Sequence, residues 1–247
     1  MTSPRPVAVI SNAHFYVGPE LARHLAQRGF DLVLGEAKEP LAIELRNLGA
    51  EVEVVSGVRD LTVAASSQRL VQAAIDRFGR LDSAVMFSGD IVTGRFVNAT
   101  EDQWRSVIAG CMDAPFHFLQ AAIPPMTKAG AGQILVITSA TAARPTPGAP
   151  LYSAARAGAT MLVRNVAHEI AASGVQVNAV GTNYMDFPAF LAATGAQDPE
   201  IRARIEAQVP MRRLGTMTEF ASFCMTFLDG SSRFTTGQYV SYAGGWA

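Results

Sequence analysis

The chain has 247 residues, of which 49% are hydrophobic, and a formal net charge of -1 at pH 7. This length can bury one large core, and α/β units of this size are routinely single domains. The near-neutral charge offers no basic surface for nucleic acid and no polybasic segment for a membrane. Since no apolar stretch approaches the ~18 residues of a membrane span, we expect a protein that binds neither nucleic acids nor membranes.

The N-terminal segment and the cysteines indicate a cytoplasmic protein. Met1–Pro6 is short and runs directly into the apolar Val7–Ile10, so it lacks the anatomy of a signal peptide. Cys111 and Cys224 lie far apart, without CxxC or CxxH spacing, which is typical of reduced, mostly buried thiols. The four histidines also lack metal-ligand spacing, so no metal site is expected.

Short β-branched apolar runs alternate along the chain with longer stretches of helical periodicity. Because the runs are apolar on both faces, they predict a parallel sheet with helices on both faces. No linker or repeat divides the chain, so residues 1–247 are expected to form a single, doubly wound α/β domain. The predicted elements in chain order are strand Val7–Ile10, helix Gly18–Arg28, strand Asp31–Leu34, helix Pro40–Leu48, strand Glu51–Val55, helix Thr62–Phe78, strand Ser83–Phe87, helix Glu101–Ala129, strand Gln133–Thr138, helix Leu151–Ala172, strand Val175–Val180, helix Thr218–Leu228 and strand Tyr239–Ser241.

Three polar residues around the fifth strand form a candidate acid–base group. Ligands of doubly wound sheets bind beyond the carboxyl ends of the strands, and Ser139 directly follows the strand Gln133–Thr138. Tyr152 and Arg156 are four residues apart on the next helix, so their side chains share a face. A guanidinium beside a phenol favours the phenolate, which can take a proton from a substrate hydroxyl while Ser139 binds the same oxygen. Tyr-x-x-x-Arg spacing alone is common in ordinary cores; the serine at the strand end favours catalysis.

The segment ITSATAARPTPGAPLYSAARAGA and the closing TGQYVSYAGG resemble the short-chain dehydrogenase/reductase superfamily, and the resemblance extends over essentially the whole chain. It implies a Rossmann-like fold. In that superfamily a serine, a tyrosine and a lysine four residues after the tyrosine carry out hydride chemistry with NAD(P).

This sequence departs from the superfamily pattern in four places. The missing glycines of the first loop are the residues that allow a tight turn and a close approach to a pyrophosphate. We therefore expect that the chain uses no cofactor. The departures are Ser11–Gly18 in place of the glycine-rich loop, Met86–Gly89 in place of Asn-Asn-Ala-Gly, Cys111 in place of a helix asparagine, and Arg156 in place of the lysine.

The combination of Ser139, Tyr152 and Arg156 with an altered first loop is similar to the halohydrin dehalogenases. Gly181–Phe190, GTNYMDFPAF, resembles the halide-binding loop of that family, and QVPMRRLGTMTEF resembles the region after it. The resemblance implies a cofactor-independent carbon–halide lyase that converts vicinal halohydrins to epoxides and halide. It also implies the reverse opening of epoxides, bulky or cyclic ones included, by halide, azide, cyanide or nitrite.

The same resemblance assigns further site residues and an assembly. Asp186 is expected to point away from a bound anion and to cap the helix that begins near Pro188. A homotetramer, a dimer of dimers, is expected from packing of the two long helices. The implied halide-binding residues are Tyr16, Thr182, Asn183, Tyr184 and Met185, and the implied walls of the substrate pocket, for which core packing is equally consistent, are Phe87, Thr141, Phe187, Phe190 and Trp246.

Two other interpretations remain open. One is an NAD(P)-dependent oxidoreductase of the superfamily with a degenerate glycine loop, which titration with NADH or NADPH would detect. The other is a catalytically silent scaffold or sensor with a dinucleotide-binding fold. That protein would be indifferent to the substitution Tyr152→Phe.

Overall fold

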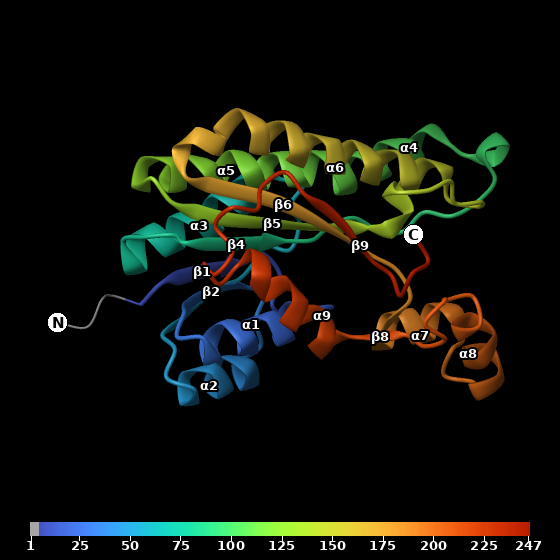
Figure 1. The fold of residues 1–247 in the computed structure, drawn as a ribbon, viewed down its shortest axis with the longest axis horizontal. Helices are drawn as coiled ribbons and strands as arrows, with labels where there is room; N and C mark the ends of the chain where they lie inside the picture. The colour runs from blue at the N-terminus through green and yellow to red at the C-terminus, as the bar shows by residue number, and fades with distance from the viewer. Residues whose placement is uncertain (1–4) are drawn as a thin grey trace.

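Seven parallel strands form one sheet at the centre of this computed structural model, which describes residues 5–247 (Figure 1). Most of the N-terminal segment Met1–Pro6 lies outside the described residues. The strand order is β3-β2-β1-β4-β5-β6-β9. The predicted single-domain, Rossmann-like α/β fold is thus confirmed. The strands are β1 (Val7–Ile10), β2 (Asp31–Gly35), β3 (Val52–Val55), β4 (Ser83–Met86), β5 (Gly132–Ser139), β6 (Val175–Thr182) and β9 (Tyr239–Tyr242).

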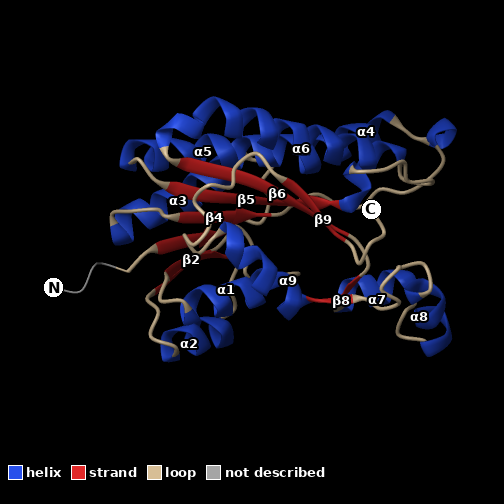
Figure 2. Ribbon diagram, viewed as in Figure 1, coloured by secondary structure: helices blue, strands red, loops and turns tan. Residues whose placement is uncertain are grey.

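Helices cover both faces of the sheet, as Figure 2 shows by colour. On one face lie α1 (Gly18–Gln27), α2 (Glu39–Asn47) and α9 (Met217–Cys224). On the other face lie α3 (Ala64–Phe78), α4 (Glu101–Ile108), α5 (Ala114–Ala129) and α6 (Pro150–Ile170). Each predicted helix is present, but the single helix expected over Glu101–Ala129 is divided.

Alternate residues of each strand enter two separate hydrophobic cores. Val7 and Val9 of β1 pack in the core beneath α3, α5 and α6, whereas Ala8 and Ile10 pack in the core beneath α1 and α9. All four side chains are at most 1% exposed. Successive strand residues point to opposite faces, so a strand buried on both sides must be apolar throughout.

A π-helical turn at Ala109–Asp113 divides α4 from α5. At this turn Gly110 packs directly on Gly89, because a Cβ atom on Gly110 would lie 2.7 Å from the Cα atom of Gly89. The Ser88 hydroxyl donates to the carbonyl oxygen of Gly110 at 2.7 Å. The prediction of one continuous helix over Glu101–Ala129 was therefore wrong. The helix widens into a π-helical turn at the point where it contacts the loop after β4.

The segment between β6 and α9 contains the helix expected near Pro188 and further secondary structure that the sequence does not predict. Two short helices, α7 (Pro188–Thr194) and α8 (Pro199–Glu206), lie beyond the carboxyl end of the sheet (Figure 1). Beside them β7 (Met185–Asp186) pairs with β8 (Gly215–Thr216) in a parallel two-stranded sheet. The segment therefore lies where ligands of this fold class bind.

No helix within residues 5–247 has the length and apolar character needed to cross a membrane. The same described residues contain no group of three or more His, Cys, Asp and Glu side chains suited to a metal ion.

Candidate active site

Ser139 lies at the carboxyl end of the central strand β5 and is 5% exposed. Its Oγ accepts hydrogen bonds from the backbone N–H of Thr141 at 3.2 Å and from the Thr141 hydroxyl at 3.0 Å. Its own hydrogen points to the carbonyl oxygen of Thr182 at 3.5 Å, the outer limit of a hydrogen bond. Ser139 therefore keeps a weakly used donor that a substrate oxygen can take over.

A close joint between β5, β6 and β9 fixes the position of Ser139. The Tyr239 hydroxyl donates to the carbonyl oxygen of Ser139 at 3.0 Å. A Cβ atom on Gly181 would lie 2.4 Å from the Tyr239 Oη and 2.6 Å from the Ser139 carbonyl oxygen. Tyr239 carries no sequence signal for this role, because its contact with Ser139 depends on how β9 pairs with β6 in the folded sheet.

Tyr152 and Arg156 lie on the buried face of α6 and are 6% and 5% exposed. The guanidinium carbon of Arg156 lies over the Tyr152 ring, 5.0 Å from its centroid. Arg156 Nη2 donates to the carbonyl oxygens of Ser88 and, at 3.4 Å, Gly89. The two residues thus come together as their spacing predicts, and the loop after β4 fixes the guanidinium.

The positive charge of Arg156 has no carboxylate partner within 4.0 Å in the part of the chain that the structure describes. Burial acts to lower the pKa of Arg156, but the Tyr152 phenol, the Cys111 thiol and the Tyr16 phenol raise it above its ordinary value. Its Nε has no hydrogen-bond partner among residues 5–247. A buried cation without a carboxylate partner favours an anionic oxygen atom on a bound molecule close to it.

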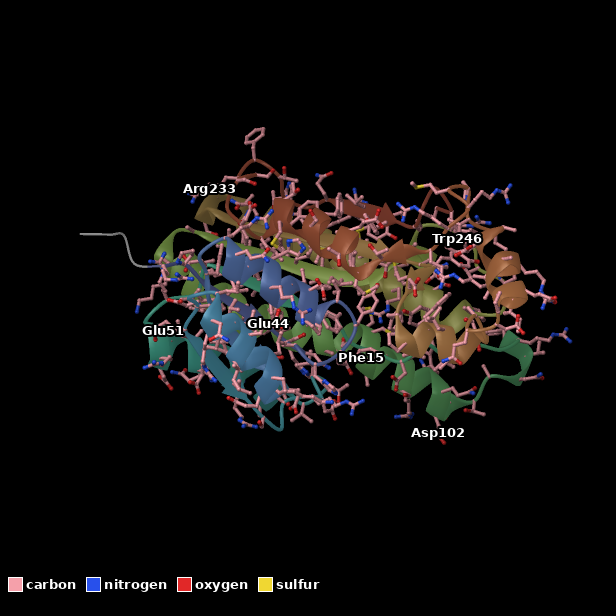
Figure 3. The ribbon with its side chains drawn as sticks, turned by 90° about the horizontal axis from the view of Figure 1, so that it is seen from below. Phe15, Glu44, Glu51, Asp102, Arg233 and Trp246 are labelled. Carbon is pink, nitrogen blue, oxygen red and sulfur yellow. The ribbon has the colours of Figure 1, made fainter. Side chains whose placement is uncertain are left out.

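Tyr16 projects from the loop between β1 and α1 across the ends of the strands. Its hydroxyl donates to Thr182 Oγ1 at 2.8 Å. Its ring centroid lies 5.7 Å from that of Phe87 and 4.8 Å from that of Phe187. Burial raises the pKa of the Tyr16 phenol. The neighbouring Phe15, labelled in Figure 3, is 47% exposed on the same loop.

In the segment 183–185, expected to bind halide, one backbone N–H and the Tyr184 side chain make contacts within the chain. The N–H of Tyr184 already donates to Asn183 Oδ1 at 2.9 Å, and Met185 is 3% exposed. The Tyr184 hydroxyl donates to Gln208 Oε1 at 3.0 Å, and its ring packs 5.7 Å from Trp246. Tyr184 is therefore engaged with the C-terminal segment.

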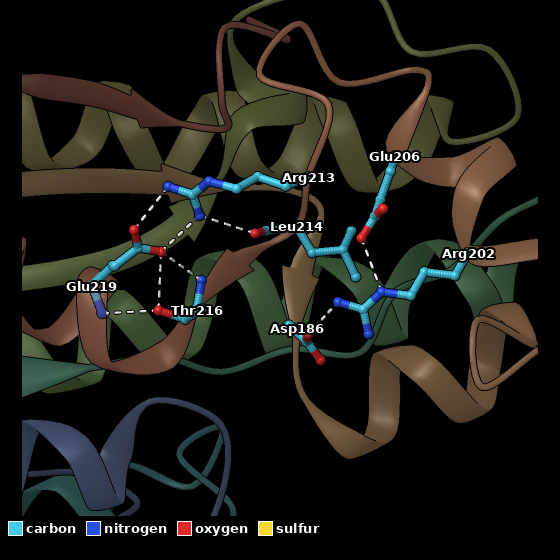
Figure 4. A network of polar contacts seen from close by, with 7 residues as sticks. All are labelled: Asp186, Arg202, Glu206, Arg213, Leu214, Thr216 and Glu219. Carbon is cyan, nitrogen blue, oxygen red and sulfur yellow. Dashed lines mark hydrogen bonds and ion pairs between the residues drawn. The ribbon is translucent and has the colours of Figure 1, made fainter. Parts of the chain in front are cut away.

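Asp186 forms an ion pair and does not cap a helix. Arg202 Nη2 donates to Asp186 Oδ2 at 2.6 Å, while Arg202 Nε donates to Glu206 at 2.9 Å (Figure 4). The N-cap of α7 is Phe187, which makes no side-chain capping bond. The expected capping role of Asp186 was wrong, because Arg202 of α8 binds its carboxylate.

The residues expected to line a substrate pocket divide into two groups. Phe187 stacks on Phe190 with a centroid distance of 6.3 Å, and Phe87 packs against Tyr16 from the other side. These rings form an apolar wall over the strand ends. Thr141 instead is 8% exposed and hydrogen-bonded to Ser139, so it supports the serine.

The crevice that holds a dinucleotide in this fold class lies where the strand order reverses, between β1 and β4. Gly18 is retained, and a Cβ atom there would lie 2.0 Å from the carbonyl oxygen of Asn12. Glu36, which follows β2, binds the N–H of Val58 at 2.6 Å with one carboxylate oxygen. With Tyr16 across the crevice and no glycine between Asn12 and Val17, these residues do not fit a dinucleotide in this conformation.

Comparisons with known proteins identify the chain's relatives. A family model described as Enoyl-(Acyl carrier protein) reductase matches residues 17–247. D-beta-hydroxybutyrate dehydrogenase of Rhizobium meliloti is 30% identical over 254 residues, covering 97% of each chain. The 2,5-dichloro-2,5-cyclohexadiene-1,4-diol dehydrogenase LinX of Sphingobium indicum is 28% identical over 246 residues, covering 98% of this chain and 96% of that protein. The crystal structure of acetoin dehydrogenase from Enterobacter cloacae matches with a TM-score of 0.85 and 26% identity, and the match covers 100% of this chain and 96% of that chain.

These relatives overturn the expected cofactor-independent halohydrin dehalogenase. All three are named dehydrogenases, and the family model is named for a reductase. The assignment as a carbon–halide lyase was wrong, and the halide role of Tyr16, Thr182 and the segment 183–185 is withdrawn with it. The comparisons favour the alternative of an NAD(P)-dependent oxidoreductase with a degenerate glycine loop, because the likeness spans the chain whereas the departures are local.

Proposed function

We propose, from the premise that this chain belongs to the short-chain dehydrogenase/reductase superfamily, that it is an oxidoreductase interconverting an alcohol and a carbonyl compound. The observation that carries this proposal is the contact of Arg156 with the Tyr152 ring on α6, together with Ser139 at the carboxyl end of β5. The rings of Phe87, Phe187 and Phe190 favour a small substrate that is apolar around its reacting carbon.

The chain's own residues account for the proton transfer at the substrate oxygen. Ser139 donates its weakly used hydrogen to that oxygen and orients it. Tyr152 accepts the hydroxyl proton during oxidation and returns a proton to the carbonyl oxygen during reduction. The buried Arg156 charge stabilises the phenolate, which is the form of Tyr152 that accepts the proton in oxidation and that remains after reduction. Oxidoreductases of this superfamily exchange hydride with a nicotinamide dinucleotide, a group that the crevice does not fit with Tyr16 in the position described.

Turnover with added coenzyme tests the proposal. The purified chain is assayed with NAD+ or NADP+ and a panel containing acetoin, D-beta-hydroxybutyrate and a cyclic diol, the substrate types in the relatives' names. We expect formation of reduced coenzyme with at least one alcohol. Tyr152→Phe should lower kcat by about 10²–10⁴, and Arg156→Lys should retain part of kcat because the charge persists.

Tyr242→Phe is the matched control, because the Tyr242 ring packs against Phe220 and Phe223 and its hydroxyl has no assigned role. This variant should keep the kcat of the unaltered chain. The absence of coenzyme-dependent turnover across the panel, in both directions, would contradict the proposal. It would favour a catalytically silent protein instead.

The expected assembly and location complete the proposal. A homotetramer would cover Phe116 of α5 and Met161 of α6, whose side chains are 47% and 50% exposed. Trp246 contacts Arg144 of the same chain, whose guanidinium lies 4.7 Å from the Trp246 ring centroid and donates to the Trp246 carbonyl oxygen at 2.8 Å. A cytoplasmic location is proposed from the cysteine pattern.

A further inference from the structure

We propose that Ser88 is a positioning residue of the candidate active site. Its hydroxyl joins the loop after β4 to the π-helical turn, and this hydrogen bond determines where the Arg156 guanidinium lies against Tyr152. The inference rests on the proposed function, since it assigns a further residue to the same site. Ser88 acts through Arg156 and takes no part in the proton transfer itself.

A proline leaves one carbonyl oxygen of the π-helical turn without its helical donor. Within the turn, the N–H of Ala114 donates to the carbonyl oxygen of Ala109, five residues earlier. By the same spacing the donor to the Gly110 carbonyl would be Pro115, which has no N–H. The Ser88 hydroxyl lies 2.7 Å from the Gly110 oxygen and donates to it. The serine therefore satisfies a backbone group that the helix cannot satisfy.

The main chain of the same serine binds the guanidinium. Arg156 Nη2 donates to the carbonyl oxygen of Ser88 and, at 3.4 Å, to that of Gly89. Among residues 5–247 the Arg156 Nε has no hydrogen-bond partner, and no carboxylate lies within 4.0 Å of the guanidinium. The two carbonyl oxygens thus orient a buried charge that lacks an ion-pair partner. A shift of the loop would therefore shift the guanidinium.

Close packing brings the turn, the loop and α6 together around this pair. A Cβ atom on Gly89 would lie 2.7 Å from Cys111 Sγ and 2.9 Å from the Gly110 carbonyl oxygen. The φ of Gly89 is 83°, a conformation that glycine adopts without strain. Cys111 of the turn packs in one buried cluster with Tyr152. The Ser88 hydroxyl is thus a directional contact at a joint that borders the catalytic tyrosine.

Replacing Ser88 with alanine removes the hydroxyl and keeps both carbonyl groups of the loop. The Gly110 oxygen then needs another donor, so we expect the loop and the turn to move apart. In the alcohol assay kcat should fall by about 10–100-fold, the effect of a small misplacement of a catalytic group. KM should stay unchanged, because substrate binding does not depend on this hydrogen bond. Ser88→Thr keeps a hydroxyl and should retain most of kcat.

A second measurement follows the guanidinium directly and needs no turnover. In a 1H–15N spectrum of the arginine side chains, the Nε–H signal of Arg156 is identified by its loss in Arg156→Lys. Ser88→Ala should shift this signal, because the guanidinium changes its contacts with the loop. Ser88→Thr should leave the signal in place.

Ser83→Ala is the matched control. Ser83 is 1% exposed at the start of β4, at the other end of the strand, and its hydroxyl donates to the carbonyl oxygen of Leu228. Its replacement removes the same kind of hydrogen bond and should lower the melting temperature, but leave kcat and the Arg156 signal unchanged. Circular dichroism establishes that each variant is folded. Ser88→Cys, whose thiol is a weak donor, replaces Ser88→Ala if the alanine variant is unfolded.

An unchanged Arg156 signal or an unchanged kcat in Ser88→Ala would overturn the positioning role, and so would an equal fall of kcat in Ser83→Ala. These outcomes are separable from those of the proposed function. A shifted Arg156 signal in Ser88→Ala, without turnover of any alcohol by the unaltered chain, would support the contact between Ser88 and Arg156 and contradict the oxidoreductase. Turnover by the unaltered chain, with the signal and kcat unchanged in Ser88→Ala, would do the reverse.

Discussion

Replacing Gly181 with alanine would place a methyl group inside the joint that holds Ser139. The new Cβ atom would lie 2.4 Å from the Tyr239 Oη and 2.6 Å from both the carbonyl carbon and oxygen of Ser139. Two of these atoms belong to the backbone of β5, which pairs with β6 along its whole length. They cannot rotate away as the end of a flexible side chain would.

The size of the effect follows from these contacts. The Cβ atom and its neighbours must separate by roughly 1 Å to reach van der Waals distance. Overpacking of this kind costs about 1–3 kcal/mol, and we expect the upper part of the range because two central strands must move. For a domain of this size the melting temperature should fall by about 4–12 °C. Displacement of Ser139 by such a distance should lower kcat by up to about 10²-fold.

Thermal unfolding by circular dichroism and turnover of the best alcohol measure both effects. Gly158→Ala is the control, because its Cβ atom would meet only the flexible end of Met112, with the sulfur at 2.7 Å. Adding Tyr239→Phe to Gly181→Ala should restore only part of the stability, since the contacts with Ser139 remain. A Gly181→Ala variant with the melting temperature and kcat of the unaltered chain would show that the close packing of Gly181 on Ser139 and Tyr239 supports neither stability nor catalysis.

Three further outcomes are expected. Hydrogen bonds from Arg213 and then Thr216 lower the pKa of the Glu219 carboxyl to about 2 (Figure 4). Since this pKa lies below the unfolded value of about 4.3, the ionised carboxylate stabilises the fold, and Glu219→Gln should lower the melting temperature at pH 7. The difference between the two melting temperatures should vanish as the pH falls through about 2. Asp198→Ala removes the N-cap of α8, which accepts from Glu200 N at 2.7 Å, and should cost about 1 kcal/mol in urea unfolding; an unchanged midpoint would contradict the cap. Ser139→Ala should lower kcat by about 10²–10³ in the alcohol assay, and equal kcat values would exclude Ser139 from catalysis.

The strands could be predicted because a strand buried on both faces has a short run of apolar residues in the sequence. All seven predicted strands occur, with ends within two residues of the expected positions. The start of α7 at Pro188 was predicted, whereas α8 was missed because it is short and has no buried residue that would give a periodic pattern. The π-helical turn was missed because it depends on Gly110 meeting Gly89, a contact between distant segments.

In the candidate site too, local features could be predicted and contacts between distant segments could not. The spacing of Tyr152 and Arg156 on one helix is a local property, and the structure brings the two together. The partners of Arg156, the carbonyl oxygens of Ser88 and Gly89, carry no sequence signature because every residue has a carbonyl group. The expected halohydrin chemistry was wrong because the four departures from the superfamily pattern are local, whereas the match to the reductase family extends over residues 17–247.

The proposal that Tyr152 transfers the proton in an oxidoreductase reaction is tested most directly by the rate of NAD+ or NADP+ reduction with acetoin or a related secondary alcohol. The rate is measured for the unaltered chain and for Tyr152→Phe. We expect coenzyme-dependent turnover whose kcat Tyr152→Phe lowers by about 10²–10⁴ and Tyr242→Phe leaves unchanged. Equal rates in the unaltered chain and in Tyr152→Phe would contradict the claim that this phenol carries the proton.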